Sequence, residues 1–367
     1  MSKTFMMRAI ELARFGMGKT SPNPCVGAVI VKGGFVVAEG WHRKAGEKHA
    51  EIVAIDSLMK KSGIKTVDID PALFSNADLY VTLEPCCHFG KTSPCASKVI
   101  KARFKNVFIG MKDPFSKVNG KGIWAMKRAG IKVEVVKPDC DLAFEVRSLN
   151  QPFIKWAQMG MPYVVLKAGM TLDGKTATRY GESKWITSEA ARKDARNLRN
   201  LFDAVLVGSG TVKADNPRLG EKLRIVVDGN LSCDPKSQVF RDENCFVACT
   251  SCAPLANRRA FEKAGIKFRT FGSRIVSLKS LLKYLGKQGV LSVFVEGGGK
   301  IHGGFVDGKL VDKVIFYIAP MIIGDHEAFD VISGTGFSSL KKALRLKDLD
   351  VVKVGEDLKV SGEVNFY

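Results

Sequence analysis

Short apolar runs and longer amphipathic segments alternate through the first part of the chain. The runs that predict strands are rich in Val, Ile and Leu and cover residues 26–31, 35–38, 79–83, 107–110 and 131–136. The segments with apolar residues at helical spacing cover residues 4–15, 49–58, 95–103, 123–128 and 139–150. An alternation of this kind predicts an α/β domain with a mostly sequential sheet.

A second alternating series follows. Its predicted strands are residues 163–168, 204–207, 224–227, 246–248, 290–295 and 314–318, with helical stretches at residues 188–201, 254–264 and 278–285. Gln151-Pro152 and Met161-Pro162 break the pattern between the two series, so we place the boundary near residue 148. We therefore expect two α/β domains, residues 1–147 and 148–367, each with its own core.

The formal net charge of +20 is spread over the chain without a long basic run. Such a charge suits nucleic acid, phosphorylated small molecules or simply a solvated surface. No apolar run approaches the length of a membrane span, and charged residues interrupt the apolar ones near the N-terminus, which argues against a secretory signal. The nine cysteines include the adjacent Cys86 and Cys87 and favour a reducing, cytoplasmic location.

The residue types of a zinc site are found in His49, Cys86 and Cys95. One imidazole and two thiolates can hold zinc tetrahedrally and leave the fourth position to water. Glu51 lies two residues after His49, where it is poorly placed as a ligand but can carry protons for that water. His-x-Glu followed by Pro-Cys-x-x-Cys is the signature of zinc nucleobase deaminases, and here a longer loop separates the two cysteines.

A purely structural zinc site is an alternative interpretation. It would need a fourth protein ligand, which Cys87 or His88 could supply, and it would leave Glu51 without a role. In the second domain, Gly297 to Gly299 follow a predicted buried strand. Bare backbone N–H groups there could cradle the phosphates of a dinucleotide, although a flexible turn is the commoner reason for such a run.

Several motifs resemble those of the bifunctional deaminase–reductase family of riboflavin biosynthesis. They include Thr82-Leu83-Glu84-Pro85-Cys86 and Thr171-Leu172-Asp173-Gly174-Lys175, together with residues 20–27, 41–51, 88–95, 113–114, 120–122, 181–187, 208–217 and 295–299. The resemblance covers nearly the whole chain. It implies a cytidine-deaminase-like α/β/α domain that uses Zn²⁺, followed by a dihydrofolate-reductase-like α/β domain that uses NADPH.

The resemblance also implies roles for individual residues. In the first domain, those that would bind the base and ribose phosphate of the substrate are Asn23, His42, His88 and Lys91. In the second domain, those that would contact NADPH are Gly169, Trp185, Thr211, Asp215, Gly297, Gly298 and Gly299. Those that would contact the ribosyl substrate are Lys167, Ser183, Arg199, Leu219, Lys222 and Glu296.

Two positions depart from the family pattern. Gly220-Glu221-Lys222 stands where the family usually has threonine and then arginine, and Lys222 could replace the arginine as a point charge for phosphate. Gly229 stands where the family often has serine. Both departures concern ligand contacts and leave the predicted reaction class unchanged.

We therefore expect a cytoplasmic bifunctional enzyme. The implied reactions are zinc-dependent deamination of 2,5-diamino-6-(5-phosphoribosylamino)pyrimidin-4(3H)-one and NADPH reduction of the ribosyl group, which gives 5-amino-6-(5-phosphoribitylamino)uracil. The expected partners are small phosphoribosyl pyrimidines, with no role for nucleic acid or membrane, and association with a second copy of the chain is left open. The alternatives are a nucleic-acid base deaminase with an accessory domain, which the positive charge would suit, and a zinc-stapled binding protein without activity.

Overall fold

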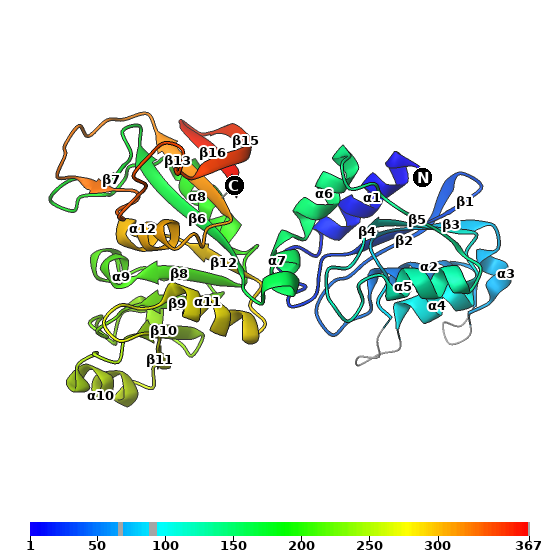
Figure 1. Ribbon diagram of the computed structural model, residues 1–367, viewed down its shortest axis with the longest axis horizontal. Helices are drawn as coiled ribbons and strands as arrows, with labels where there is room; N and C mark the ends of the chain where they lie inside the picture. The colour runs from blue at the N-terminus through cyan, green and yellow to red at the C-terminus, as the bar shows by residue number, and fades with distance from the viewer. Residues whose placement is uncertain (65–68, 88–93, 366–367) are drawn as a thin grey trace. The chain divides into compact units, whose positions relative to one another are not determined.

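The computed structural model describes residues 1–64, 69–87 and 94–365, and the chain forms two compact units. Each unit has a sheet of its own with helices packed against it (Figure 1). The predicted α/β class is therefore confirmed for both halves. The units divide between Gly160 and Met161, later than residue 148, because α6 (Asp141–Leu149) packs against α1 (Lys3–Arg14) of the first unit. The assignment of domains to residues 1–147 and 148–367 stays a prediction.

The first unit contains a five-stranded sheet in the order β2-β1-β3-β4-β5. Its strands are β1 (Gly27–Lys32), β2 (Phe35–Trp41), β3 (Ala77–Leu83), β4 (Asn106–Met111) and β5 (Lys132–Val135). The remaining helices are α2 (Ala50–Lys61), α3 (Pro71–Phe74), α4 (Cys95–Ala102), α5 (Lys121–Arg128) and α7 (Gln151–Met159). β1 runs antiparallel to β2 and β3, whereas β3, β4 and β5 are parallel.

Helices cover both faces of this sheet, so the central strands β1 and β3 are buried almost throughout. α1 and α6 lie on one face, and α2, α4 and α5 lie on the other (Figure 1). Gly27 allows α1 to approach β1 closely, because a Cβ atom at this position would lie 2.0 Å from the carbonyl oxygen of Ala9.

Two helices of the first unit were not predicted. α3 is a single short turn with Pro71 at its start. α7 begins at Gln151-Pro152, which we had interpreted as a break. Proline is tolerated in the first turn of a helix because the N–H that it lacks would have no intrahelical acceptor there. The same dipeptide that ends α6 therefore also starts α7.

The second unit contains a nine-stranded sheet in the order β11-β10-β9-β8-β12-β6-β13-β16-β15. The parallel strands are β6 (Tyr163–Thr171), β8 (Ala204–Gly208), β9 (Leu223–Val227), β10 (Cys245–Cys249), β11 (Phe268–Thr270), β12 (Ser292–Val295) and β13 (Lys313–Ala319). The hairpin β15 (Arg345–Val354) and β16 (Asp357–Asn365) continues the sheet antiparallel to β13. β7 (Lys175–Ala177) and β14 (Phe329–Asp330) form a separate pair.

The helices of this unit are α8 (Glu189–Arg199), α9 (Ser209–Asp215), α10 (Leu255–Lys263), α11 (Leu278–Lys287) and α12 (Gly299–Asp307), with a short 3₁₀ turn at Gln238–Phe240. All six predicted strands and the three predicted helical stretches are present. The hairpin β15–β16 and strand β11 were not predicted, because most of their residues are polar or exposed. None of the helices in the described part of the chain is long and apolar enough to cross a membrane.

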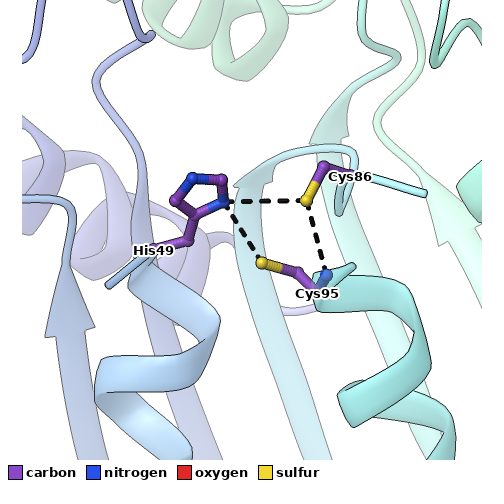
Figure 2. Close-up of side chains that lie close together, drawn as sticks. All are labelled: His49, Cys86 and Cys95. Atoms are coloured by element: carbon purple, nitrogen blue, oxygen red, sulfur yellow. Dashed lines mark hydrogen bonds between the residues drawn. The ribbon is translucent and has the colours of Figure 1, made fainter. Parts of the chain in front are cut away.

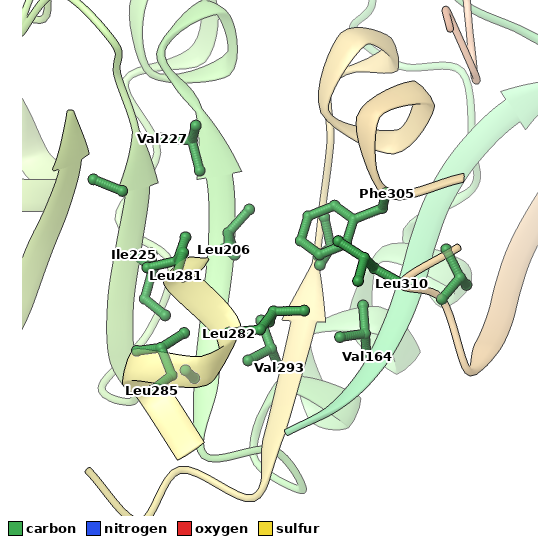
Figure 3. Close-up of a cluster of buried hydrophobic side chains, with 14 of the residues drawn as sticks. Val164, Leu206, Ile225, Val227, Leu281, Leu282, Leu285, Val293, Phe305 and Leu310 are labelled. Atoms are coloured by element: carbon green, nitrogen blue, oxygen red, sulfur yellow. The ribbon is translucent and has the colours of Figure 1, made fainter. Parts of the chain in front are cut away.

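One core of the second unit lies between the sheet and the helices α11 and α12. Figure 3 shows Leu281, Leu282 and Leu285 of α11 and Phe305 of α12 directed towards strand residues such as Val293. These side chains are nearly or fully buried. Burial of each large apolar side chain contributes about 1.5–3 kcal/mol, so this layer holds both helices on the sheet.

Asn150 connects the end of the first unit to the loop before β1. Its side-chain oxygen accepts a hydrogen bond from the backbone N–H of Cys25 at 2.8 Å, and its amide donates to the carbonyl oxygen of Cys25, also at 2.8 Å. The side chain is 2% exposed, so these two bonds replace water on both sides. They fix the loop that carries Asn23, one of the predicted substrate residues.

We expect Asn150→Ala to destabilise the first unit. The change leaves the N–H and the carbonyl of Cys25 without their side-chain partner, and each unsatisfied buried group costs about 1–3 kcal/mol. Urea denaturation measures the loss. Asn150→Asp, which turns a carboxylate oxygen towards the carbonyl oxygen of Cys25 in a buried site, should be at least as destabilised as the alanine variant. Equal stability of all three proteins would contradict this role.

Candidate active sites

Three separate elements of the first unit bring His49, Cys86 and Cys95 together. His49 is the residue before α2, Cys86 follows β3, and Cys95 is the first residue of α4. Nδ1 of His49 lies 3.7 Å from Sγ of Cys86 and 3.2 Å from Sγ of Cys95 (Figure 2). The three ligand atoms lie within 4.8 Å of one another, so one ion can reach all of them.

The pKa of one of the two thiols is shifted in the direction that favours metal binding. A hydrogen bond between the two thiols lowers the pKa of Cys86 to about 4, and the same bond raises the pKa of Cys95. The backbone N–H of Cys95 also donates to Sγ of Cys86 at 3.4 Å. Cys86 is thus prepared as a thiolate, which is the form that binds metal. A nitrogen and two sulfurs at these separations fit Zn²⁺.

A fourth protein ligand is not part of this cluster in the described residues. Cys87 was a candidate, but its Sγ lies 3.9 Å from the carbonyl oxygen of Lys117. His88, the other candidate, lies outside the described residues. Among the described residues, the arrangement leaves a coordination position for water, as catalytic zinc sites do.

Glu51 lies in the first turn of α2 and lines the same cavity as His49 and Cys86. The residue is 3% exposed, and its burial raises the pKa of the carboxyl group to about 7. A carboxyl group with such a pKa is available in both protonation states near neutral pH, which is what a proton carrier requires.

The cavity has a volume of about 440 Å³ and includes the two predicted substrate residues Asn23 and His42. Nδ1 of His42 lies 3.1 Å from the carbonyl oxygen of Lys48, which can only accept a hydrogen bond, so this nitrogen carries the proton. Nε2 of His42 lies 3.1 Å from the side-chain amide of Asn23. Burial lowers the pKa of His42, which keeps its ring neutral. Lys91, a further predicted substrate residue, lies outside the described residues.

The structure adds residues to this site to which we had assigned no role. Phe115, Phe153 and Trp156 form an aromatic wall of the cavity, in which the rings of Phe115 and Trp156 are stacked with centroids 5.8 Å apart. Asp113 also lines the cavity, and its burial raises the pKa of its carboxyl group to about 6. Asp113-Pro114 had been noted only as a family motif, and no pattern in the sequence singles out the three aromatic residues.

Glu84 supports both the metal ligand and the cavity wall. Its buried carboxylate accepts hydrogen bonds from the backbone N–H groups of Asp113, Gly120, Gly122 and Ile123, at 2.9–3.2 Å. Three of these donors belong to the start of α5, where negative charge is favourable. Because Cys86 follows two residues later, one carboxylate holds the metal-binding strand end against the segment that carries Asp113 and Phe115.

In the second unit, the structure brings together Lys167, Arg199 and Glu296. They come from β6, the end of α8 and the residue after β12. The guanidinium of Arg199 binds both carboxylate oxygens of Glu296, and Nζ of Lys167 lies 3.7 Å from Oε2 of Glu296. Burial by itself would raise the pKa of Glu296, but the two cations outweigh this effect and lower the pKa. Two cations against one carboxylate leave a net positive charge, which suits an anionic ligand.

Among the predicted cofactor residues, Thr211 lies beside the glycine run. Gly297 to Gly299 connect β12 to α12, and the carbonyl of Gly297 accepts a hydrogen bond from the N–H of Gly208 at 2.9 Å. A Cβ atom at Gly298 would lie 3.7 Å from Oγ1 of Thr211, so Thr211 faces the run. Asp215 ends the same helix, α9. Gly169, on the central strand β6, lies next to Thr187.

The remaining predicted residues are more dispersed. Ser183 and Trp185 lie in the loop before α8, where Trp185 is 65% exposed and the guanidinium of Arg192 lies 4.1 Å from its ring. Leu219 is buried with the apolar core near β9, so any substrate contact would have to involve its backbone. Lys222 lies just ahead of β9. None of these four belongs to the Lys167–Arg199–Glu296 cluster.

The first unit has a zinc site on a deaminase-like sheet, and the second unit has a glycine run of the dinucleotide-binding type. This combination defines the class of two-domain deaminase–reductases. Residues 1–111 match the cytidine and deoxycytidylate deaminase zinc-binding region, and residues 162–360 match the RibD C-terminal domain. The chain is 40% identical to riboflavin biosynthesis protein RibD of Bacillus amyloliquefaciens over 98% of this chain and 96% of that protein. It is 34% identical to RibD of Escherichia coli, over 96% and 97% of the two chains.

Solved structures agree with this result. RibD of Acinetobacter baumannii (form 1) superposes with a TM-score of 0.85 at 34% identity, covering 99% of this chain and 98% of that one. A diaminohydroxyphosphoribosylaminopyrimidine deaminase/5-amino-6-(5-phosphoribosylamino)uracil reductase from Thermotoga maritima gives 0.81 at 34% identity, with the same coverage. The chain belongs to the RibD family of riboflavin biosynthesis proteins. Its zinc-binding deaminase domain and its RibD reductase domain imply Zn²⁺ and NADPH as cofactors.

We expect Glu84→Gln to destabilise the first unit by about 1.5–3 kcal/mol, the range for a hydrogen bond to a charged group. The amide of glutamine has one acceptor oxygen, so its NH₂ group would face backbone N–H groups that now donate to Glu84. Chemical denaturation measures the change, with zinc content determined in parallel. Glu39→Gln, which alters a carboxylate paired with Arg8 nearer the surface, should cost under about 1 kcal/mol. A Glu84 variant as stable as the Glu39 variant would contradict this role.

Proposed function

We propose that the first site deaminates a phosphoribosylated diaminopyrimidinone and that the second reduces the ribosyl group of the product with NADPH. The name of the Thermotoga maritima relative describes a deaminase and a reductase for these two substrates. The observation that carries the proposal is the His49–Cys86–Cys95 cluster with the buried carboxyl group of Glu51 on the same cavity. Zinc held there would supply Lewis-acid activation of water.

Glu51 is the proton carrier in this proposal. Its carboxylate takes a proton from the attacking water and passes it to a ring nitrogen of the pyrimidine. It then takes the proton of the new hydroxyl group on the tetrahedral carbon and delivers it to the amino group, which leaves as ammonia as the carbonyl forms. The pKa of about 7 supports both directions of transfer. Its burial also keeps bulk water from exchanging these protons during the reaction.

The rest of the cavity orients the base. Asn23 and the neutral His42 form a hydrogen-bonded pair that offers polar groups to a planar ligand. The aromatic wall of Phe115, Phe153 and Trp156 provides flat apolar surface on the same cavity. An enclosed cavity of this kind suits a small heterocycle. We therefore favour a small phosphoribosyl pyrimidine, in the cytoplasm, over a base within a nucleic acid. Competition by single-stranded RNA or DNA would favour the nucleic-acid alternative.

In the second site, the Lys167–Arg199–Glu296 cluster binds the ribosyl substrate. The net positive charge attracts the phosphate or the oxygen of the opened sugar, and Glu296 fixes Arg199 through two contacts. Gly298 leaves room for a cofactor next to Thr211, because in the described part of the chain a Cβ atom there would have Thr211 as its one non-adjacent neighbour within 4 Å. NADPH bound there would supply the hydride that converts the ribosyl group to a ribityl chain.

We expect Glu51→Gln to reduce ammonia release by about 10²–10⁴-fold, the usual contribution of a general acid–base. Glutamine keeps the shape of the side chain but cannot carry the proton. Zinc content and NADPH oxidation with 5-amino-6-(5-phosphoribosylamino)uracil should be unchanged. Asp56→Asn, on the same helix, should retain full ammonia release. Wild-type ammonia release in the Glu51 variant would refute the mechanism.

We expect Arg199→Lys to raise the KM of the reductase for its uracil substrate by about tenfold, which corresponds to about 1.4 kcal/mol. Lysine keeps the charge but loses the planar two-point contact with Glu296. Steady-state NADPH oxidation measures this change, and ammonia release in the same preparation serves as the internal control. An unchanged KM would remove Arg199 from the substrate site.

A further inference from the structure

Tyr317 lies in the middle of β13 and is 1% exposed. Its hydroxyl group donates a hydrogen bond to Oδ2 of Asp194 at 2.6 Å. The ammonium group of Lys359 donates to the same oxygen at 2.7 Å. Lys359 is the residue directly opposite Tyr317 on β16, so a helix and two strands hold the phenol group in one place.

The ring of Tyr317 also lies near the reductase site. Nζ of Lys167 is 5.8 Å from the ring centroid, within the range of a cation–π interaction. Tyr317 pairs with Gly169 on β6, and Lys167 lies two residues earlier on the same strand, so both side chains project from the same face of the sheet. Gly169 has no side chain that could separate them.

Lys167 needs such support because its contact with Glu296 is loose. The distance of 3.7 Å between Nζ and Oε2 exceeds that of a direct hydrogen bond. A lysine has a flexible four-carbon stem, and a single ion pair at this distance leaves several rotamers open. The ring of Tyr317, anchored through its hydroxyl group, adds a second contact that restricts the ammonium group to the position beside Glu296.

Asp194 connects this support to the other cation of the site. Asp194 and Arg199 lie on the same helix, α8, and bind Tyr317 and Glu296 respectively. On the same helix, Ala191, Ala195 and Leu198 pack against strand residues such as Val165. The Asp194–Tyr317 bond therefore sets the position of α8 on the sheet, and hence that of Arg199.

We infer that Tyr317, anchored by Asp194 and Lys359, is a positioning residue of the reductase site that holds Lys167 beside Glu296. The inference rests on the proposed function of the Lys167–Arg199–Glu296 cluster. It assigns the aromatic ring, and not the hydroxyl group alone, to the support of Lys167. If Tyr317 only filled the core and satisfied its hydroxyl group, removal of the ring would lower kcat no more than removal of the hydroxyl group.

The test compares Tyr317→Phe with Tyr317→Leu in the full-length chain, by NADPH oxidation with 5-amino-6-(5-phosphoribosylamino)uracil. Phenylalanine keeps the ring and should lower kcat by two- to threefold. Leucine removes the ring and should lower kcat by about tenfold, with the KM for NADPH unchanged. Equal kcat values for the two variants, or a loss seen only in the KM for NADPH, would overturn the inference.

Asp194→Asn tests the anchor without changing the core, in case the leucine variant does not fold. Asparagine keeps an oxygen acceptor but loses the charge that binds Lys359, so kcat should fall by two- to fivefold with an unchanged KM for NADPH. A wild-type kcat in this variant would contradict the proposed anchor. Ammonia release from each variant should equal that of wild type, which controls for the amount of intact chain, and the unchanged KM for NADPH controls for folding of the second unit. Failure of the wild-type chain to oxidise NADPH would refute the proposed function itself.

Discussion

The direction of parallel strands determines where the polar residues of both units meet. In the first unit, β3 ends just before Glu84 and Cys86, beside its parallel neighbour β4. In the second, β12 pairs in register with β6, so that Glu296 follows Val295, opposite Leu166, and arrives next to Lys167. The carboxyl edge is where such sheets open to ligands. Both candidate sites follow from this one constraint.

Three buried carboxyl groups at these edges are stabilised in different ways. The difference distinguishes carboxyl groups that hold the structure together from one that can transfer protons. Glu84 receives four backbone N–H groups and holds loops together. Glu296 receives two cationic side chains and fixes them for a ligand. For Glu51, desolvation outweighs the attraction of His49, and its pKa rises to about 7. A fully compensated charge is rigid and inert, whereas an incompletely compensated one can exchange protons.

Much of the architecture was predictable because apolar periodicity reports burial directly. The predicted strands of both units exist, and the metal triad His49, Cys86 and Cys95 does converge. Periodicity failed where burial was low, as in β15, and where proline was taken as a break although it starts α7. Leu219, assigned to the substrate through resemblance, packs its side chain into the core. The individual ligand contacts of the second unit stay predictions.

The sequence by itself determined the chemistry, because a histidine, two cysteines and a nearby glutamate have few other uses in this pattern, and because the family motifs lie in its own residues. Only the tertiary structure decided which side chains surround that chemistry. Phe115 and Trp156 stack although they are far apart in sequence, and Tyr317 meets Asp194 across a helix and a strand. Such contacts depend on how elements pack in three dimensions, and no local period or spacing along the chain records them.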